Sequence, residues 1–260
     1  MAHILVTNDD GVDAPGLLAL VHGLASAGRL TVLAPDKNWS ASGHVKTMHR
    51  PLRVREARLS DGTAALAADG APSDCVALAV LGLVEGPIDL VVSGINPHAN
   101  VGHDVTYSGT VTAAMEAAIS GLAAMAVSLD TPENSHGERD YASAARVAAL
   151  LARQVLDRGL PPGVLLNVNV PSRPLAALRG LTFTRQGLRL YRDALVRRED
   201  PRGRPYYWIG GEAPTGVEEE GTDFWALAQG FVSVTPLQLD LTAHAHLQTF
   251  EAWDRSLSAD

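Results

Sequence analysis

The chain has 260 residues, 46% of them hydrophobic, and carries a formal net charge of −8 at pH 7. This length and composition can bury a large core, either as one big domain or as a domain with an extension. The negative charge argues against a nucleic-acid polymer as the main partner. It does not exclude a small phosphorylated substrate, because a bound divalent cation can reverse the sign of the charge locally.

The chain shows no signal for a membrane or for export. No run approaches ~18 uninterrupted apolar residues, and Met1-Ala2-His3 leads directly into an apolar strand without a charged leader. Cys75 is the only cysteine, which excludes an internal disulfide and a thiolate metal cluster. We therefore expect a soluble, cytoplasmic protein in which Cys75 is a small core residue.

Predicted strands and helices alternate along the first two thirds of the chain. Apolar runs predict strands at 4–6, 30–34, 88–92, 124–127 and 164–168, with weaker ones at 52–54 and 64–66. Helical patterns occupy 14–27, 72–84, 111–120 and 142–156, and Asp13 is a candidate cap for the first helix. Alternation of this kind predicts an α/β fold, in which a mostly parallel sheet has helices on both faces.

The pattern changes beyond Leu178. Short strand-like pieces at 181–185, 206–209 and 231–235 precede a last helix from about Thr242. We therefore divide the chain into a core, 1–178, and a β-rich arm with a terminal helix, 179–260. The arm carries Trp208, Phe224, Trp225 and Phe231, an apolar load that short strands satisfy by pairing with a second copy. The alternative is that the arm folds back onto its own sheet.

Two adjacent carboxylates, Asp9 and Asp10, directly follow the first predicted strand, and Gly11 releases the turn after them. Neighbouring carboxylates repel each other and are costly to desolvate, so such a pair persists mainly where a cation compensates it. At the end of an α/β strand, that cation is most often a metal ion or a metal-bound phosphate ligand. The alternative is an ordinary solvated turn.

Oxygen-bearing side chains follow two other predicted strands. Ser40 lies in the loop after the second strand, and Asn96 follows the strand at 88–92. Ligands of open parallel sheets bind beyond the carboxyl ends of the strands, so these side chains are expected to converge with the acidic pair. Two carboxylates, a hydroxyl and an amide carbonyl suit Mg²⁺, Mn²⁺ or Ca²⁺.

The loop 93–102 leads to Tyr107-Ser108-Gly109-Thr110 at a helix start. Free backbone N–H groups and two hydroxyls at a helix N-terminus form an anion site, and helix capping by Ser108 is compatible with that role. A metal beside such a helix end points to phosphate ester chemistry. His98 and His103 in the same region are candidate proton donors, with exposed loop histidines as the alternative.

Several phosphate-handling motifs are missing from the sequence. There is no Gly-x-x-x-x-Gly-Lys loop and no Gly-x-Gly-x-x-Gly after the first strand, which weakens ATPase and dinucleotide-binding interpretations. The two aspartates are adjacent rather than one residue apart, which disfavours phosphatases that form a phosphoaspartate.

Longer motifs carry a resemblance to a known family. Residues 7–11 (TNDDG), 93–96 (SGIN), 107–111 (YSGTV), 220–223 (EGTD) and 233–237 (SVTPL) are similar, in order, to the survival protein E (SurE) family. The resemblance implies a metal-dependent nucleoside monophosphate phosphatase with a Rossmann-like core and a C-terminal arm that forms a homodimer or homotetramer.

The resemblance also implies roles for individual residues. Asp9, Asp10, Ser40 and Asn96 would hold one divalent cation per subunit, with Mg²⁺ or Mn²⁺ expected and Ca²⁺ also compatible. Asn100, Ser108, Gly109 and Thr110 would surround the phosphate. The family usually has Gly where this chain has His98, and Thr where it has Ala71. His98 would then narrow the pocket or contact the leaving nucleoside, so substrate preference stays open.

The sequence therefore predicts a hydrolase that releases phosphate from nucleoside 5′- or 3′-monophosphates. The cation would polarise the phosphoryl oxygens and supply or orient the attacking water, and either Asp9 or Asp10 would act as general base. Two alternatives remain. One is a protein that senses a metal–nucleotide complex without turnover, and the other is a phosphatase of non-nucleotide esters. Tyr107 as a stacking partner for a base is weak support for a nucleotide.

Overall fold

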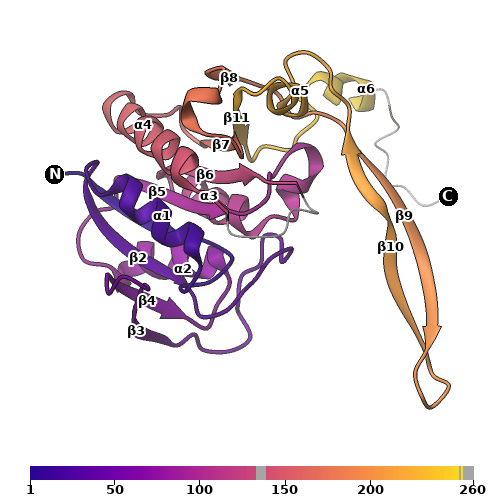
Figure 1. Cartoon of the computed structure of the whole chain (residues 1–260), viewed down its shortest axis with the longest axis horizontal. Helices are drawn as coiled ribbons and strands as arrows, with labels where there is room; N and C mark the ends of the chain where they lie inside the picture. The colour runs from indigo at the N-terminus through magenta and orange to yellow at the C-terminus, as the bar shows by residue number, and fades with distance from the viewer. Residues whose placement is uncertain (133–138, 252, 254–260) are drawn as a thin grey trace.

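A nine-stranded sheet forms the centre of the molecule (Figure 1). The structure is a computed structural model that describes residues 1–132, 139–251 and 253. The strand order is β3-β4-β2-β1-β5-β6-β7-β11-β8. The strands are β1 (His3–Thr7), β2 (Arg29–Pro35), β3 (Val54–Arg58), β4 (Ala64–Ala68), β5 (Leu90–Asn96), β6 (Ala123–Asp130), β7 (Val164–Pro171), β8 (Leu181–Phe183) and β11 (Val232–Gln238).

The order in which the chain adds parallel strands reverses at β1. From β1 the chain adds β2 and β4 on one side, then returns to add β5, β6 and β7 on the other, all parallel. The loops that leave β1 and β5 therefore diverge to opposite sides. In open α/β sheets, this switch point is where a ligand crevice forms beyond the carboxyl ends of the strands.

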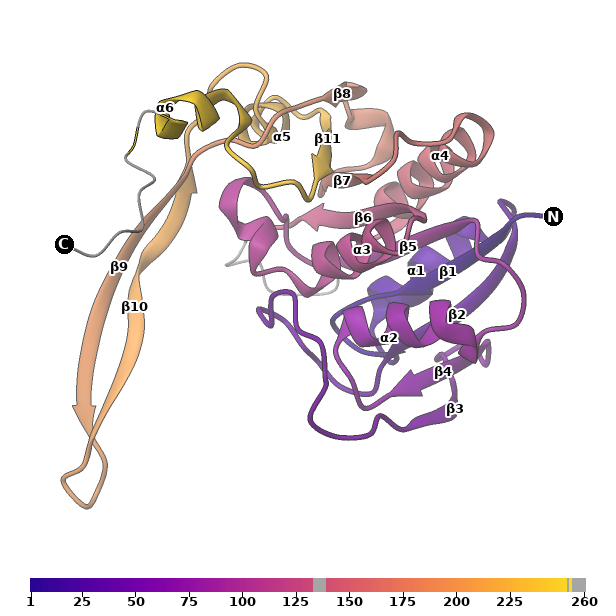
Figure 2. The ribbon, with the colours of Figure 1, turned by 180° about the vertical axis from the view of Figure 1, so that it is seen from behind.

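Two helical layers cover the sheet. The helices α1 (Pro15–Leu24) and α4 (Ala142–Arg158) lie on the face seen in Figure 1, and α2 (Pro72–Leu78) and α3 (Gly109–Ile119) lie on the face seen in Figure 2. Alternate strand residues divide between two cores: Ile4 and Val6 pack with α1 and α4, whereas Leu5 packs with α2 and α3. Cys75 is fully buried in the second core, as predicted.

The last third of the chain has two different fates. The strands β11 and β8 extend the central sheet, with β11 antiparallel to β7 and β8 parallel to β11. Between them, β9 (Arg189–Glu199) and β10 (Pro205–Gly216) form an antiparallel hairpin that projects far from the sheet (Figures 1 and 2). The short helices α5 (Asp223–Ala228) and α6 (Leu247–Glu251) lie near the base of the hairpin in both views.

The predicted fold class, a mostly parallel α/β sheet with helices on both faces and a C-terminal β-rich arm, is confirmed. Some local predictions are wrong. Ala14, not Asp13, is the N-cap of α1, and no side chain caps that helix. The weak strand expected at 52–54 begins at Val54, and the helix expected from Thr242 begins at Leu247. In the part of the chain that the structure describes, no helix has the length and apolar character needed to span a membrane.

Candidate metal and phosphate site

The acidic pair lies in a tight turn directly after β1. The Asn8 side chain braces this turn, because its Nδ2 donates to the Gly11 carbonyl at 3.0 Å and its Oδ1 accepts from the Gly11 amide at 3.2 Å. Gly11 has a φ of +104°, and a Cβ there would lie 3.2 Å from the Lys37 backbone. A glycine is thus required for the turn that presents Asp9 and Asp10 at the switch point.

Asp9 packs against the N-terminus of α3. The Thr110 hydroxyl donates to Asp9 Oδ1 at 2.5 Å, and a Cβ on Gly109 would lie 2.7 Å from the Asp9 Cβ. Burial raises the pKa of Asp9, whereas the Thr110 hydroxyl and the backbone amides of Gly109 and Thr110 oppose that rise. The N–H groups at the start of α3 therefore meet the Asp9 carboxylate, and a phosphate site at this helix end stays a prediction.

The surroundings of Asp10 also disfavour its ionised form. Burial raises the pKa of Asp10 to about 7, the Asp9 charge adds to the rise, and the Arg139 guanidinium opposes it. The Asn38 side chain donates to Asp10 Oδ1 at 3.3 Å. Two adjacent, largely buried carboxylates of this kind fit a bound cation, which would compensate both charges.

The loop after β2, which carries Ser40, contacts the turn that holds the acidic pair. The Trp39 amide donates to the Asp9 carbonyl at 2.7 Å, which joins this loop to the turn after β1. The Ser40 amide in turn donates to Asn38 Oδ1 at 2.7 Å, and Ser40 itself is exposed. The structure therefore brings the Ser40 loop to the acidic pair, as predicted from the shared sheet edge.

Asn96 is the last residue of β5, the strand next to β1. The register pairs Thr7, the last residue of β1, with Ser93, so the carboxyl ends of the two strands lie side by side. Its Nδ2 donates to the His98 carbonyl at 2.6 Å, so the side-chain oxygen is the atom that could bind a cation.

All four predicted metal ligands thus lie at one edge of the sheet. Among the described residues, no three His, Cys, Asp or Glu side chains gather in a metal-binding group. A metal at this edge would therefore rest on two carboxylates completed by hydroxyl and amide oxygens. That donor set suits a hard divalent cation.

The predicted phosphate residues are all held in place by hydrogen bonds, in different ways. Ser108 is the N-cap of α3, and its hydroxyl accepts from the Val111 amide at 3.1 Å. Asn100 is buried, and its Nδ2 donates to the Ser128 hydroxyl at 2.8 Å. The Asn100 backbone is bound by two strand residues that the sequence analysis did not assign, Asn167 and Asn169 of β7. The sequence signal that could have identified them is the occurrence of two asparagines in an otherwise apolar strand, because buried amides need hydrogen-bond partners.

The two loop histidines differ in their surroundings. His98 is half-buried, with Nδ1 at 3.1 Å from the Thr131 carbonyl and Nε2 at 3.3 Å from Arg139 Nη2. His103 lies exposed in the short helical turn Gly102–Thr106. Sequence reasoning did not identify Arg139, because nothing local links it to the strand ends.

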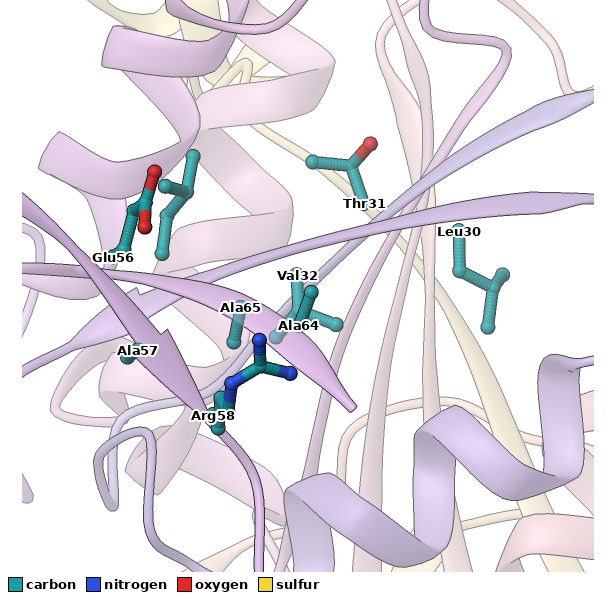
Figure 3. Close-up of a pocket in the computed structure, with 9 residues that line it drawn as sticks. Leu30, Thr31, Val32, Glu56, Ala57, Arg58, Ala64 and Ala65 are labelled. Carbon is teal, nitrogen blue, oxygen red and sulfur yellow. The ribbon is translucent and has the colours of Figure 1, made fainter. Parts of the chain in front are cut away.

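A cavity of about 670 Å³ lies on another part of the sheet. Figure 3 shows its lining, which comes from the first part of β2 and from β3 and β4. The candidate site lies instead beyond the carboxyl ends of the strands. Its lining is mostly aliphatic, with Glu56 and Arg58 at its border. It includes none of the candidate residues and offers no cluster suited to phosphate chemistry, so it is not the candidate site.

The fold and the site together define a class of protein: an α/β protein with a pair of adjacent carboxylates beside a helix N-terminus at its switch point. Comparison with known proteins makes this specific. The family model described as Survival protein SurE matches residues 4–193. The chain belongs to the SurE family.

The relatives match over nearly their full length. The 5′-nucleotidase SurE of Chloroflexus aggregans is 51% identical over 252 residues, which are 97% of this chain and 99% of that protein. The 5′-nucleotidase SurE of Geobacter sulfurreducens is 52% identical over 98% of this chain and 94% of its own length. Among solved structures, the SurE protein from Aquifex aeolicus has a TM-score of 0.80 and 40% identity, covering 96% of this chain and 98% of that chain.

Proposed function

We propose that this chain is a metal-dependent phosphatase that hydrolyses nucleoside 5′- or 3′-monophosphates to nucleoside and phosphate. The observation that carries the proposal is the Asp9–Asp10 pair at the switch point, in contact with the N-terminus of α3 through Thr110. The 5′-nucleotidase names of relatives that are about half identical over nearly the whole chain support it.

The residues that would hold one divalent cation per subunit are Asp9, Asp10, Ser40 and Asn96. Mg²⁺ or Mn²⁺ is the proposed ion, and Ca²⁺ is compatible with the same oxygen ligands. When bound, the cation would polarise the phosphoryl oxygens and lower the pKa of a water at the site.

The chain's own groups have separable tasks. The Ser108-Gly109-Thr110 turn would orient the phosphate through the helix dipole at the start of α3, while the amides of Gly109 and Thr110 hold the Asp9 carboxylate. Ser108 holds this helix start in place as its N-cap. Asn100 is proposed to contact the phosphate from a backbone fixed by β7. Asp9 and Asp10 both stay candidates for the general base.

A phosphate-release assay tests the proposal and separates it from its alternatives. The panel would contain nucleoside 5′- and 3′-monophosphates, sugar phosphates and another simple phosphate ester, each with Mg²⁺ or Mn²⁺ and after chelation. Turnover confined to nucleotides supports the proposal, and preference for other esters would redirect it to a general phosphatase. Nucleotide binding without turnover on any substrate would identify a sensor instead.

We further propose that the protein is a cytoplasmic homodimer or homotetramer assembled through residues 179–260. The hairpin exposes large apolar side chains, including Leu195 at 72% and Ile209 at 84% exposed, beside Trp208. A projecting two-stranded ribbon with such side chains is marginal alone and gains stability by packing on a second copy. Light scattering at micromolar concentration tests this, because a mass near 27.4 kDa would contradict it.

A further inference from the structure

Arg139 lies three residues before the first residue of α4 and is held by His98. Its Nη2 is 3.3 Å from His98 Nε2, while His98 Nδ1 is 3.1 Å from the Thr131 carbonyl. A carbonyl oxygen only accepts, so Nδ1 carries the proton and Nε2 accepts from the guanidinium. His98 is therefore a neutral acceptor that orients Arg139. Its own carbonyl accepts from the candidate metal ligand Asn96, which ties this arrangement to the site.

The Arg139 guanidinium is joined to the site through His98, whose ring it contacts and whose carbonyl accepts from Asn96. The charge of Arg139 opposes the rises that burial causes in the pKa of Asp10 and of Tyr141. Among the described residues, the buried Arg139 Nε has no hydrogen-bond partner. A buried donor of a charged group is costly to leave unpaired, which indicates that a ligand completes its hydrogen bonding.

We propose that Arg139 is a substrate-binding residue that takes the phosphate group of the substrate, and that His98 is the positioning residue that aims its guanidinium. The inference rests on the proposed phosphatase function. A phosphate dianion entering beside two carboxylates needs more positive charge than helix amides supply, and a planar guanidinium matches two phosphate oxygens at once.

The competing explanation is that Arg139 only stabilises the ionised form of Asp10 or the fold of its own loop. The two explanations differ in the change of Mg²⁺ affinity that they predict for removal of Arg139. If Arg139 only keeps Asp10 ionised, its removal should weaken Mg²⁺ binding, whereas the phosphate-binding role predicts no loss. Removing a positive charge next to a metal site does not weaken Mg²⁺ binding, whereas it removes a contact to phosphate. Damage to the loop would weaken both ligands together and lower the melting temperature.

The test is calorimetric titration of the full chain with Mg²⁺ alone, then with inorganic phosphate at saturating Mg²⁺. The variants are Arg139→Ala, Arg139→Lys and His98→Phe. The matched control is Arg158→Ala, the same charge change at the exposed end of α4 on the opposite edge of the sheet. Nucleoside monophosphate and the matching nucleoside are titrated in parallel, and melting temperatures are recorded.

We expect the phosphate dissociation constant of Arg139→Ala to rise about 10- to 100-fold, the range for hydrogen bonds to a charged group. The phosphate dissociation constant of Arg139→Lys should lie between those of Arg139→Ala and wild type, because a lysine keeps the positive charge but lacks the planar guanidinium. His98→Phe should show a smaller loss in the same direction. For Arg139→Ala, Mg²⁺ affinity should be unchanged or tighter, and KM should rise more than kcat falls.

Three results would overturn the inference. The first is phosphate affinity of Arg139→Ala equal to that of Arg158→Ala. The second is a joint loss of Mg²⁺ and phosphate binding with a lower melting temperature. The third is weaker nucleotide binding with unchanged phosphate binding, which would assign Arg139 to the nucleoside. Because these readouts need no turnover, a wild-type protein that binds both ligands but hydrolyses nothing would refute the proposed function alone.

Discussion

The switch-point edge of the sheet buries polar side chains, whereas the projecting hairpin exposes apolar ones. At the edge, polar groups are buried and joined by hydrogen bonds within the chain, as between Thr110 and Asp9 or Asn169 and Asn100. On the hairpin, backbone pairing runs from Pro205–Glu199 to Gly216–Arg189, but apolar side chains such as Ile209 face outward. The core is thus stabilised by its own contacts, whereas the hairpin leaves large apolar side chains exposed.

This comparison teaches that exposure has different meanings in the two regions. Buried charge at the edge costs free energy and is retained for the ligand that compensates it. Exposed apolar area on the hairpin fits the proposed contact with a second copy. Changes at the edge should therefore alter chemistry with the assembly intact, and changes on the hairpin should alter assembly with the site intact.

The largest expected effect is that of Asp9→Asn. This change keeps the size of the side chain and an oxygen for the Thr110 hydroxyl, but it removes a charged metal ligand. We expect kcat to fall by orders of magnitude in a phosphate-release assay, with an unchanged circular dichroism spectrum and light-scattering mass. Near-normal turnover would remove Asp9 from the site.

Removal of the metal ion from the same edge of the sheet should reduce turnover almost as strongly as Asp9→Asn. Treatment with EDTA followed by gel filtration should abolish turnover, and added Mg²⁺ or Mn²⁺ should restore it. The bound cation should also raise the melting temperature, because it binds only the folded state. Undiminished activity after rigorous chelation would contradict the metal mechanism. As a control, the light-scattering mass should be the same with and without EDTA.

An intermediate effect is expected from Ile209→Arg on the hairpin. Ile209 is 84% exposed, so the charge should cost the isolated subunit little while it disrupts packing against a second copy. Light scattering should report a shift toward monomer. The matched control is Ile119→Arg at the end of α3, where the isoleucine is 60% exposed. If both variants keep the wild-type mass, the hairpin is not the contact.

The smallest effect is expected at the start of α3. Ser108→Ala removes the N-cap and should cost about 1 kcal/mol of unfolding free energy. Thr110→Ala frees Asp9 Oδ1 from its hydroxyl donor. Both variants should raise KM or lower kcat for phosphate esters, as steady-state kinetics and thermal melts can measure. Wild-type kinetics combined with much earlier melting would mean that these hydroxyls serve the helix alone.

Much of the fold followed from local pattern. Apolar runs such as Ile4-Leu5-Val6 and the helical periods between them predicted a parallel sheet with two helical layers. The hairpin strand β9 escaped this reasoning, because Arg189–Glu199 is exposed and rich in charge, so neither face carries a buried alternation. Asp13 failed as a cap because capping depends on the backbone conformation at the helix start, where Ala14 is extended.

The sequence by itself determined the acidic pair, Ser40, Asn96 and the helix start at Ser108 as candidates, because strand ends in a parallel sheet share one edge. Only the tertiary structure decided what surrounds them. The Arg139–His98 contact joins residues 41 positions apart, and Asn100 meets Asn169 across 69 positions. Such pairs depend on strand order and loop paths, which local periodicity does not encode. The physical reason is that hydrogen bonds between distant residues form only after the sheet has brought their elements together.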